Sequence, residues 1–272
     1  MSSSAPASSS ESLQPFTLYG FHKPSPAVPS GSAFCQKLEA YCRFAGIDYK
    51  SEATTPNAAP KSKLPYVKFQ DGSILADSHL IIRHLVKEGR PDLDSRAGLS
   101  DVEKADGNVY RGYLEDHVYP AIVYTRWMIP ENYYDFIDDQ FQGTSWIYKK
   151  LISNLAFYGV QSCLKGHGVG RHTPEEVESL LKISFNALIV RLIENQKDGG
   201  EWFFGKKGPS EVDAALYGVL ATTAITPSTP LVNRLVAESP ILSRYILTIT
   251  ERYFPEYVNL IDGMKRNLKT EE

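Results

Sequence analysis

The residues best suited to hold a ligand lie in one stretch of the sequence, residues 63–88. Pro65 opens a segment that alternates polar and apolar residues like a strand, and Asp71-Gly72 is a two-residue hairpin signal. Ser78 then precedes an apolar helical pattern as a candidate N-cap. A helix beginning there would present free N–H groups and the positive end of its dipole to a carboxylate. Pro65 has no N–H to donate, so the backbone group that would have paired with it is left to bond with another partner.

The same residues also permit a purely structural interpretation. Ser78 would then be only a helix cap, and Pro65 only a proline of an edge strand. Taken alone, the residues favour this interpretation, because only about 5–6% of X-Pro bonds in folded proteins are cis.

The elements before this stretch complete a small α/β domain. Phe16–Phe21 predicts a first strand, and a proline-rich loop follows it. Apolar residues at helical spacing from Phe34 predict a helix that starts at Ala33 and ends at Gly46. Residues 47–53 predict a second strand, and the segment up to 61 a short crossover. Strand, helix, strand, crossover, hairpin and helix is a thioredoxin-like order.

The rest of the chain has helical periodicity, which predicts an all-α C-terminal domain after a polar linker at 90–98. Pro120 predicts a kink, and Thr173-Pro174 predicts a helix start. Ser210 and Asp213 have the spacing of a capping box. The aromatic-rich segment 130–171 shows no clear helix breaks, residues 241–253 predict a last helix, and 260–272 predict a charged tail. The predicted domains are therefore a disordered tail at 1–14, the α/β domain at 15–90 and the helical domain at 97–260.

Composition restricts the class of protein and of partner. The chain has 272 residues, 42% of them hydrophobic and 22% charged, as in a soluble two-domain protein. A net charge of −3 gives no reason to expect nucleic acid or an anionic membrane as a partner. No apolar run approaches the roughly 18 residues of a membrane span, and the first 14 residues resemble no targeting signal. The three cysteines show no metal-ligand or disulfide spacing, so we expect a reduced, cytoplasmic protein.

Several segments resemble the glutathione S-transferase superfamily, in particular its metaxin-like and failed-axon-connections-like branch. The similarity extends over about residues 16–258, and its most specific segments are KLPYVKFQDGSILADSHLIIRHL, TRWM and GHGVGRHTPEE. It implies a thioredoxin-like N-terminal domain with a cis-proline at Pro65 and a helical C-terminal domain. It also implies that the Leu64 backbone pairs with the cysteinyl part of glutathione, while Asp77 and Ser78 hold its γ-glutamyl carboxylate. Lys61 or Lys63 would meet the glycyl carboxylate.

The resemblance also indicates where the thiol of glutathione would be activated. Ser32-Ala33-Phe34-Cys35 falls where thioredoxins have Cys-x-x-Cys, but the first sulfur is replaced by a hydroxyl. Ser32 is the first candidate to donate a hydrogen bond to the thiolate, helped by the helix dipole, and Ser30 is the second. Cys35 is a third candidate, although a buried structural thiol is the more frequent outcome. Tyr19, which lies within a strand, is expected to be a packing residue.

A site for a second, hydrophobic substrate is expected between the α/β domain and the kinked helix after Leu99. Its candidate wall residues are aromatic or carry polar tips: Tyr110, Tyr113, His117, Tyr124 and Trp127. His167 and His172 lie near each other in the sequence, but without a third ligand we expect no metal site.

Two functions remain open from the sequence. The first is a glutathione-dependent transferase that uses glutathione as its cofactor to conjugate a small hydrophobic electrophile in detoxification. A homodimer is the assembly common among such transferases. The second is a non-catalytic module that binds glutathione or a peptide and acts through protein contacts. Metaxins proper are attached to the mitochondrial outer membrane, and we expect no such C-terminal anchor here.

Overall fold

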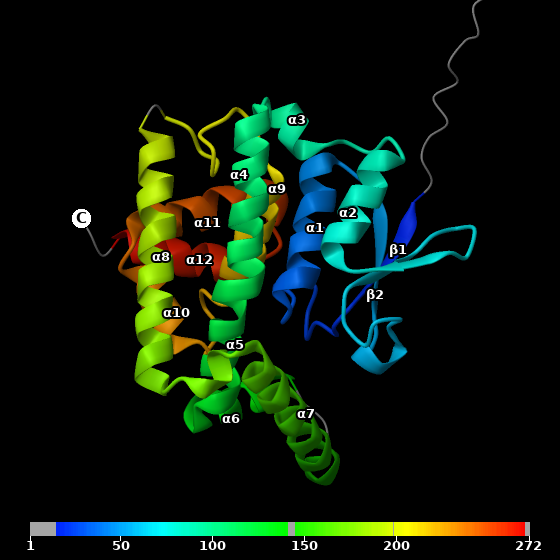
Figure 1. Cartoon of the computed structure of the whole chain (residues 1–272), viewed down its shortest axis with the longest axis vertical. Helices are drawn as coiled ribbons and strands as arrows, with labels where there is room; N and C mark the ends of the chain where they lie inside the picture. Colours follow the sequence, from blue (N-terminus) through cyan, green and yellow to red (C-terminus); the bar gives the residue numbers. More distant parts are fainter. Residues whose placement is uncertain (1–14, 141–144, 198, 270–272) are drawn as a thin grey trace, which may run out of the picture.

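In a computed structural model of the protein, residues 15–140, 145–197 and 199–269 are described (Figure 1). The N-terminal part contains a four-stranded sheet in the order β2-β1-β3-β4. Strand β1 is parallel to β2 and antiparallel to β3, and β3 is antiparallel to β4. The strands are β1 (Phe16–Gly20), β2 (Tyr49–Ala53), β3 (Tyr66–Lys68) and β4 (Ile74–Ala76). This is the predicted thioredoxin-like arrangement.

Helices α1 (Ala33–Ala45) and α2 (Ser78–Lys87) cover the face of the sheet that is turned toward the C-terminal helices (Figure 1). The first residues of β1 alternate between buried and half-buried, so Phe16 and Leu18 enter the core beneath these helices. Gly46 ends α1 in the left-handed conformation that a C-cap glycine supplies, as predicted. The crossover from β2 to β3 contains only the 3₁₀ turn η1 (Pro56–Ala58).

The described residues of the C-terminal part form helices joined by loops and no strand, as predicted, and Figure 1 shows α7 extending away from its lower end. No helix of the described residues is long and apolar enough to cross a membrane. The α-helices are α3 (Leu93–Ala97), α4 (Asp101–Gly112), α5 (Tyr119–Met128), α6 (Pro130–Gln140), α7 (Trp146–His167), α8 (Pro174–Gln196), α9 (Glu211–Ala221), α10 (Pro230–Ala237), α11 (Pro240–Tyr253) and α12 (Val258–Lys269). Short turns are the π-helix η2 (Tyr113–Val118) and the 3₁₀ turn η3 (Val169–Arg171).

The kink or break predicted at Pro120 is in the structure the π-helix η2, which joins α4 to α5 and ends two residues before Pro120. Proline has no N–H to donate to Asp116, four residues earlier, and the helix widens into η2 just before it. Instead, the Nε2 atom of His167 lies 2.8 Å from the Asp116 carbonyl oxygen. One histidine at the end of α7 thus compensates the backbone bond that Pro120 removes.

Helix α9 lies at the centre of the molecule, packed between α1 and the other C-terminal helices (Figure 1). Every residue of α9 is buried. At Gly218 a Cβ atom would lie 2.6 Å from the Ala33 carbonyl oxygen and 2.9 Å from the Lys37 nitrogen. The glycine therefore permits α1 and α9 to approach closely, and this contact fixes the start of α1 against the C-terminal domain.

Three sequence predictions were wrong in the helical elements. The linker at 90–98 contains α3, which is capped by Asp92 and ended by Gly98. The predicted charged tail is largely the helix α12, whose buried Leu260 and Met264 are one turn apart among charged residues. Helix α2 is capped by Asp77 and not by Ser78, because the Asp77 carboxylate accepts the N–H groups of His79 and Leu80.

Candidate functional site

The two halves of the predicted glutathione grip meet at the start of β3 and α2. The Leu64-Pro65 bond is cis, and the Asp77 N–H donates to the Pro65 carbonyl at 3.4 Å. Neither the N–H nor the carbonyl of Leu64 makes a hydrogen bond with any other described residue. A backbone edge with a free donor and a free acceptor is what an extended peptide needs in order to pair with it.

The first turn of α2 offers a second set of donors beside that edge. Asp77 is held at φ 92°, a conformation rare for residues other than glycine, and its carboxylate caps the helix. Ser78, the first residue of the helix, is only 4% exposed. Among the described residues, no hydrogen bond uses its N–H or its hydroxyl. Ser78 is therefore free to bind a carboxylate, whereas the Asp77 carboxylate is engaged with its own helix.

The start of α1 holds the candidates for thiol activation. Ser32 is the N-cap, and its Oγ accepts the Cys35 N–H at 3.4 Å. Ser30 Oγ accepts the Ser32 N–H at 3.2 Å, and the Ser30 N–H donates to Gln36 Oε1 at 2.9 Å. Both serines are buried, with exposed fractions of 2% and 5%. Capping uses an acceptor lone pair, so the hydroxyl proton of Ser32 is still available to a thiolate.

Cys35 points into a small apolar cluster with Leu64 and Tyr66. Burial raises the pKa of its thiol, although the hydroxyls of Ser32 and Ser30 and the Phe21 N–H act in the opposite direction. The thiol is therefore neutral near pH 7, which fits a structural residue better than a nucleophile. Tyr19 stacks on Tyr66 with ring centroids 4.6 Å apart, and burial and Glu52 raise the pKa of its phenol.

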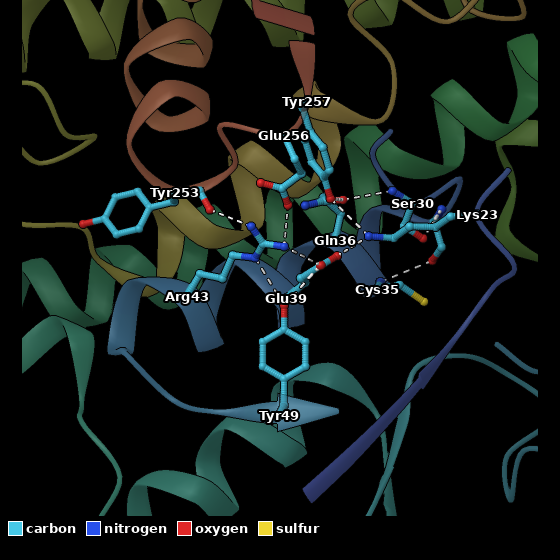
Figure 2. A network of polar contacts seen from close by, with 11 residues as sticks. Lys23, Ser30, Cys35, Gln36, Glu39, Arg43, Tyr49, Tyr253, Glu256 and Tyr257 are labelled. Atoms are coloured by element: carbon cyan, nitrogen blue, oxygen red, sulfur yellow. Dashed lines mark hydrogen bonds and ion pairs between the residues drawn. The ribbon is translucent and has the colours of Figure 1, made fainter. Parts of the chain in front are cut away.

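A polar network that the sequence did not predict holds the loop before α1 (Figure 2). Lys23 Nζ lies 2.7 Å from Glu39 Oε2 and donates to the Tyr257 hydroxyl at 3.1 Å. The Tyr257 hydroxyl donates to Gln36 Oε1, the same atom that accepts the Ser30 N–H. The loop that carries Ser30 and Ser32 is thus tied to the segment between α11 and α12.

Arg43 extends this network to the C-terminal domain. Its guanidinium contacts Glu39 and Glu256, at 3.2 and 2.6 Å, and donates to the Tyr253 carbonyl at 2.8 Å (Figure 2). The contacts with Glu256 and Tyr253 join residues more than 200 positions apart in the chain, so no local sequence pattern could have indicated them. The Arg43–Glu39 pair, by contrast, has the local i,i+4 spacing of a helix.

Four of the five predicted wall residues lie against other parts of the C-terminal domain. Tyr110 packs on Phe203 and Phe204. The other contacts are those of Tyr113 with Ser184 of α8, of Tyr124 with the His172 carbonyl, and of Trp127 with Tyr133 and Phe136 of α6. The fifth, His117, is exposed and stacks on Tyr113 at 5.0 Å.

Two other residues of α5 face the start of α1. The Tyr119 ring packs edge-on against Phe34 at 4.9 Å. The Arg126 guanidinium donates to the carbonyls of Gly31 and Thr222, both at 3.4 Å. Tyr119 and Arg126 are seven residues apart, and this spacing puts them on one face of a helix. The spacing is the sequence signal by which these two residues could have been identified.

Comparison with known proteins agrees with this geometry. A glutathione S-transferase N-terminal domain model matches residues 33–132, and a C-terminal domain model matches residues 181–249, together more than half of the chain. The chain belongs to the glutathione S-transferase superfamily.

Its relatives include both an enzyme and proteins of the predicted branch. Isoprene-epoxide–glutathione S-transferase of Rhodococcus sp. (strain AD45) is 29% identical over 87% of this chain and 98% of that protein. Metaxin-1 of Sus scrofa is 27% identical over 84% of this chain and 72% of that protein. Failed axon connections of Drosophila melanogaster is 25% identical over 92% of this chain, which spans only 60% of that protein. These similarities confirm the metaxin-like branch.

Solved structures confirm the fold. A glutathione transferase from Phanerochaete chrysosporium aligns with a TM-score of 0.61 at 12% identity, covering 88% of this chain and 98% of that one. A Methylobacterium radiotolerans glutathione S-transferase in complex with glutathione sulfonate aligns with a TM-score of 0.57 at 13% identity, covering 91% and 95%. At these identities the likeness supports the fold alone.

Proposed function

We propose that the protein is a transferase that adds the thiol of glutathione to a small hydrophobic electrophile. The observation that carries this proposal is the free backbone edge at Leu64 beside the unused donors of Ser78. The edge would pair with the cysteinyl unit of glutathione, and Ser78 would bind its γ-glutamyl carboxylate. Glutathione would be a substrate here and not a cofactor. A cytoplasmic location and a detoxifying role belong to the same proposal.

In this mechanism Ser32 holds the sulfur at the N-terminus of α1. Its hydroxyl donates to the thiolate, and the positive end of the helix favours the same anion. The thiolate then attacks a carbon of the electrophile. For an epoxide, a carbon–sulfur bond forms, a ring carbon–oxygen bond breaks, and the oxygen takes a proton. An epoxide is the first compound to test, because the Rhodococcus relative acts on one by name. Tyr119 and Phe34 would supply the apolar wall.

The test is the ionisation of bound glutathione. Thiolate absorbance of the saturated protein should rise at a lower pH than that of free glutathione, since a donor and a helix dipole both stabilise the anion. Ser32→Ala should return the titration toward the free value and slow conjugation of a small epoxide, while glutathione affinity changes little. Ser30→Ala is measured beside it, because a return of the titration in Ser30→Ala but not in Ser32→Ala would assign the role to the second candidate. Saturable binding with no shift in ionisation and no conjugation would end the transferase proposal.

A second candidate is a glutathione- or peptide-binding module without turnover. Two observations favour it: the hydroxyls of Ser30 and Ser32 are nearly inaccessible, and both accept hydrogen bonds from the loop and helix that they cap. The relatives metaxin-1 and failed axon connections are named for no transferase activity. The ionisation experiment separates this module from the enzyme, because only the enzyme needs a thiolate.

A further inference from the structure

A pocket outside the candidate glutathione site lies where the link between the two domains meets the C-terminal helices. It has a volume of about 190 Å³ and is bounded by α3, by the segment that leads into α9, and by the end of α11. None of its lining residues belongs to the candidate glutathione site. Trp202 and Tyr253 form part of its wall, and the backbone at Gly208 forms part of its rim.

The charged side chains among the described lining residues are all positive. Arg96, Lys207 and Arg252 line the pocket, and no described aspartate or glutamate does, although the chain as a whole has a net charge of −3. Arg252 is partly neutralised by Glu201 at 2.8 Å. Among the described residues, Arg96 donates only to the Phe44 carbonyl, at 3.4 Å. Lys207 has no hydrogen-bond or ion-pair partner among the described residues.

The neighbouring phenol is consistent with this charge. Burial raises the pKa of Tyr253 and the buried Asp213 adds slightly to the rise, whereas the charges of Arg252 and Arg96 lower it. Both guanidinium groups therefore act on the same wall of the pocket. The described residues that line the pocket include three cations, of which only Arg252 is ion-paired with a described carboxylate, that of Glu201. The lining therefore has an excess of positive charge that an anion would neutralise.

The size of the pocket restricts the anion. Pockets for drug-sized ligands have volumes of about 300–1,000 Å³, so this one is suited to a single small group with a few waters, each of about 30 Å³. Guanidinium groups present parallel N–H donors that match the oxygens of a phosphoryl group, and a lysine adds a point charge. We propose that Arg96, Lys207 and Arg252 form a binding site for a phosphoryl group, either inorganic phosphate or the phosphorylated end of a small metabolite.

The consequence of binding follows from the position of the site. A phosphoryl group held by Arg96 and Lys207 would connect α3 with the loop just before α9. It would bind the folded state and not the unfolded chain, and would therefore raise the unfolding temperature in a saturable way.

The experiment compares two adjacent lysines. Inorganic phosphate is titrated into the protein at constant ionic strength, and methyl phosphate is titrated in a second arm. The readouts are thermal unfolding and the intrinsic tryptophan fluorescence, to which Trp202 in the pocket wall contributes. Lys207→Gln should weaken phosphate binding about tenfold or more, which corresponds to about 1.4 kcal/mol. Lys206→Gln should leave it unchanged, because Lys206 pairs with Glu103 at 2.8 Å outside the pocket. Arg96→Gln should weaken binding as Lys207→Gln does.

The outcomes are distinct from those of the glutathione experiments, since neither readout requires glutathione. Binding of both probes would identify the site as one for phosphorylated metabolites, and binding of inorganic phosphate alone would identify it as one for the free anion. An equal effect of chloride at matched ionic strength, or equal losses in Lys206→Gln and Lys207→Gln, would overturn the proposal.

Discussion

At the scale of single residues, the candidate site depends on which polar groups are already engaged. The Asp77 carboxylate accepts the N–H groups of His79 and Leu80. By contrast, no described residue accepts a hydrogen bond from the N–H or the hydroxyl of Ser78. The resemblance treated Asp77 and Ser78 as a pair with one role. The structure separates them into a residue that holds the helix and a residue that can hold a ligand.

This separation predicts different effects for two substitutions. Glutathione at about a hundredfold excess over Kd should stabilise the wild-type protein by about 2.7 kcal/mol. Ser78→Ala should remove most of that protection and barely change the stability of the free protein. Asp77→Ala should destabilise the free protein by about 0.5–2 kcal/mol, because a helix cap is lost. Thermal unfolding with and without glutathione measures both effects, and equal protection of wild type and Ser78→Ala would exclude Ser78 as a ligand.

The sequence could predict residues whose role depends on near neighbours in the chain. Pro65 and the capping residues Thr173 and Ser210 belong to short motifs with a fixed spacing. The roles of Lys23 and Tyr257 depend instead on a contact between residues 234 positions apart. Such contacts leave no periodic trace, so the network around the Ser30–Ser32 loop was accessible only through the structure.

At the scale of elements, the capping box of α9 is the clearest connection between a short motif and the core. Asp213 is fully buried, and its Oδ2 accepts the N–H and the hydroxyl of Ser210 at 2.7 and 2.6 Å. Its Oδ1 accepts the Phe203 N–H and the Tyr245 hydroxyl. A side chain expected to cap one helix therefore also fixes the preceding loop and α11.

Asp213→Ala should consequently cost more than an ordinary cap. It leaves several buried donors without an acceptor, each worth about 1–3 kcal/mol, so we expect a loss of about 3 kcal/mol or more. Ser210→Ala should cost about 1 kcal/mol, within the usual range for a cap. Urea unfolding measures the two losses, and glutathione affinity well below the melting temperature should stay unchanged in both variants. A larger loss for Ser210→Ala than for Asp213→Ala would contradict the four-bond role of Asp213.

The helical elements also show why some predictions failed. Helix α3 is only five residues long, so it has too few turns to show a periodic pattern. In α12, mostly polar and charged residues follow the buried Leu260 and Met264, so the composition of residues 260–272 resembles that of a charged tail. An irregular helix near Pro120 was predictable because a missing N–H acts locally, but the contact of His167 with the Asp116 carbonyl joins residues 51 positions apart.

At the scale of the whole molecule, the two domains are joined by charged contacts as well as by the close packing of α1 on α9. Glu211, at the start of α9, lies 3.0 Å from His79 Nδ1 and contacts Arg83, both on α2. Its backbone N–H donates to Asp94 at 2.8 Å, in α3. Lys37 of α1 is likewise buried and lies 2.6 Å from Glu115 of η2. Any site at the domain boundary depends on these contacts for its geometry.

Glu211 gives this junction a specific dependence on pH. Burial raises the pKa of its carboxyl, but the hydrogen bond from His79 and the charges of Arg83 and Lys37 more than offset this, and the pKa lies below its ordinary value. The ionised form therefore stabilises the folded protein. That contribution is fully present above the unfolded pKa of about 4.3 and is lost as the pH falls through the lower folded pKa.

Glu211→Gln should therefore destabilise the protein at pH 7 by about 1.5–3 kcal/mol, the range for hydrogen bonds to charged groups. The difference from wild type should shrink as the pH falls below the unfolded pKa of about 4.3 and through the lower folded pKa of the Glu211 carboxyl. Glu194→Gln is the control, since Glu194 pairs with Lys197 at the surface, where an ion pair contributes about 0–1 kcal/mol. Unfolding midpoints at pH 7, 5 and 3.5 measure the effect. A loss that stays constant across this range would show that Glu211 acts through its shape and hydrogen bonds and not through its charge, and the junction would then be insensitive to acid.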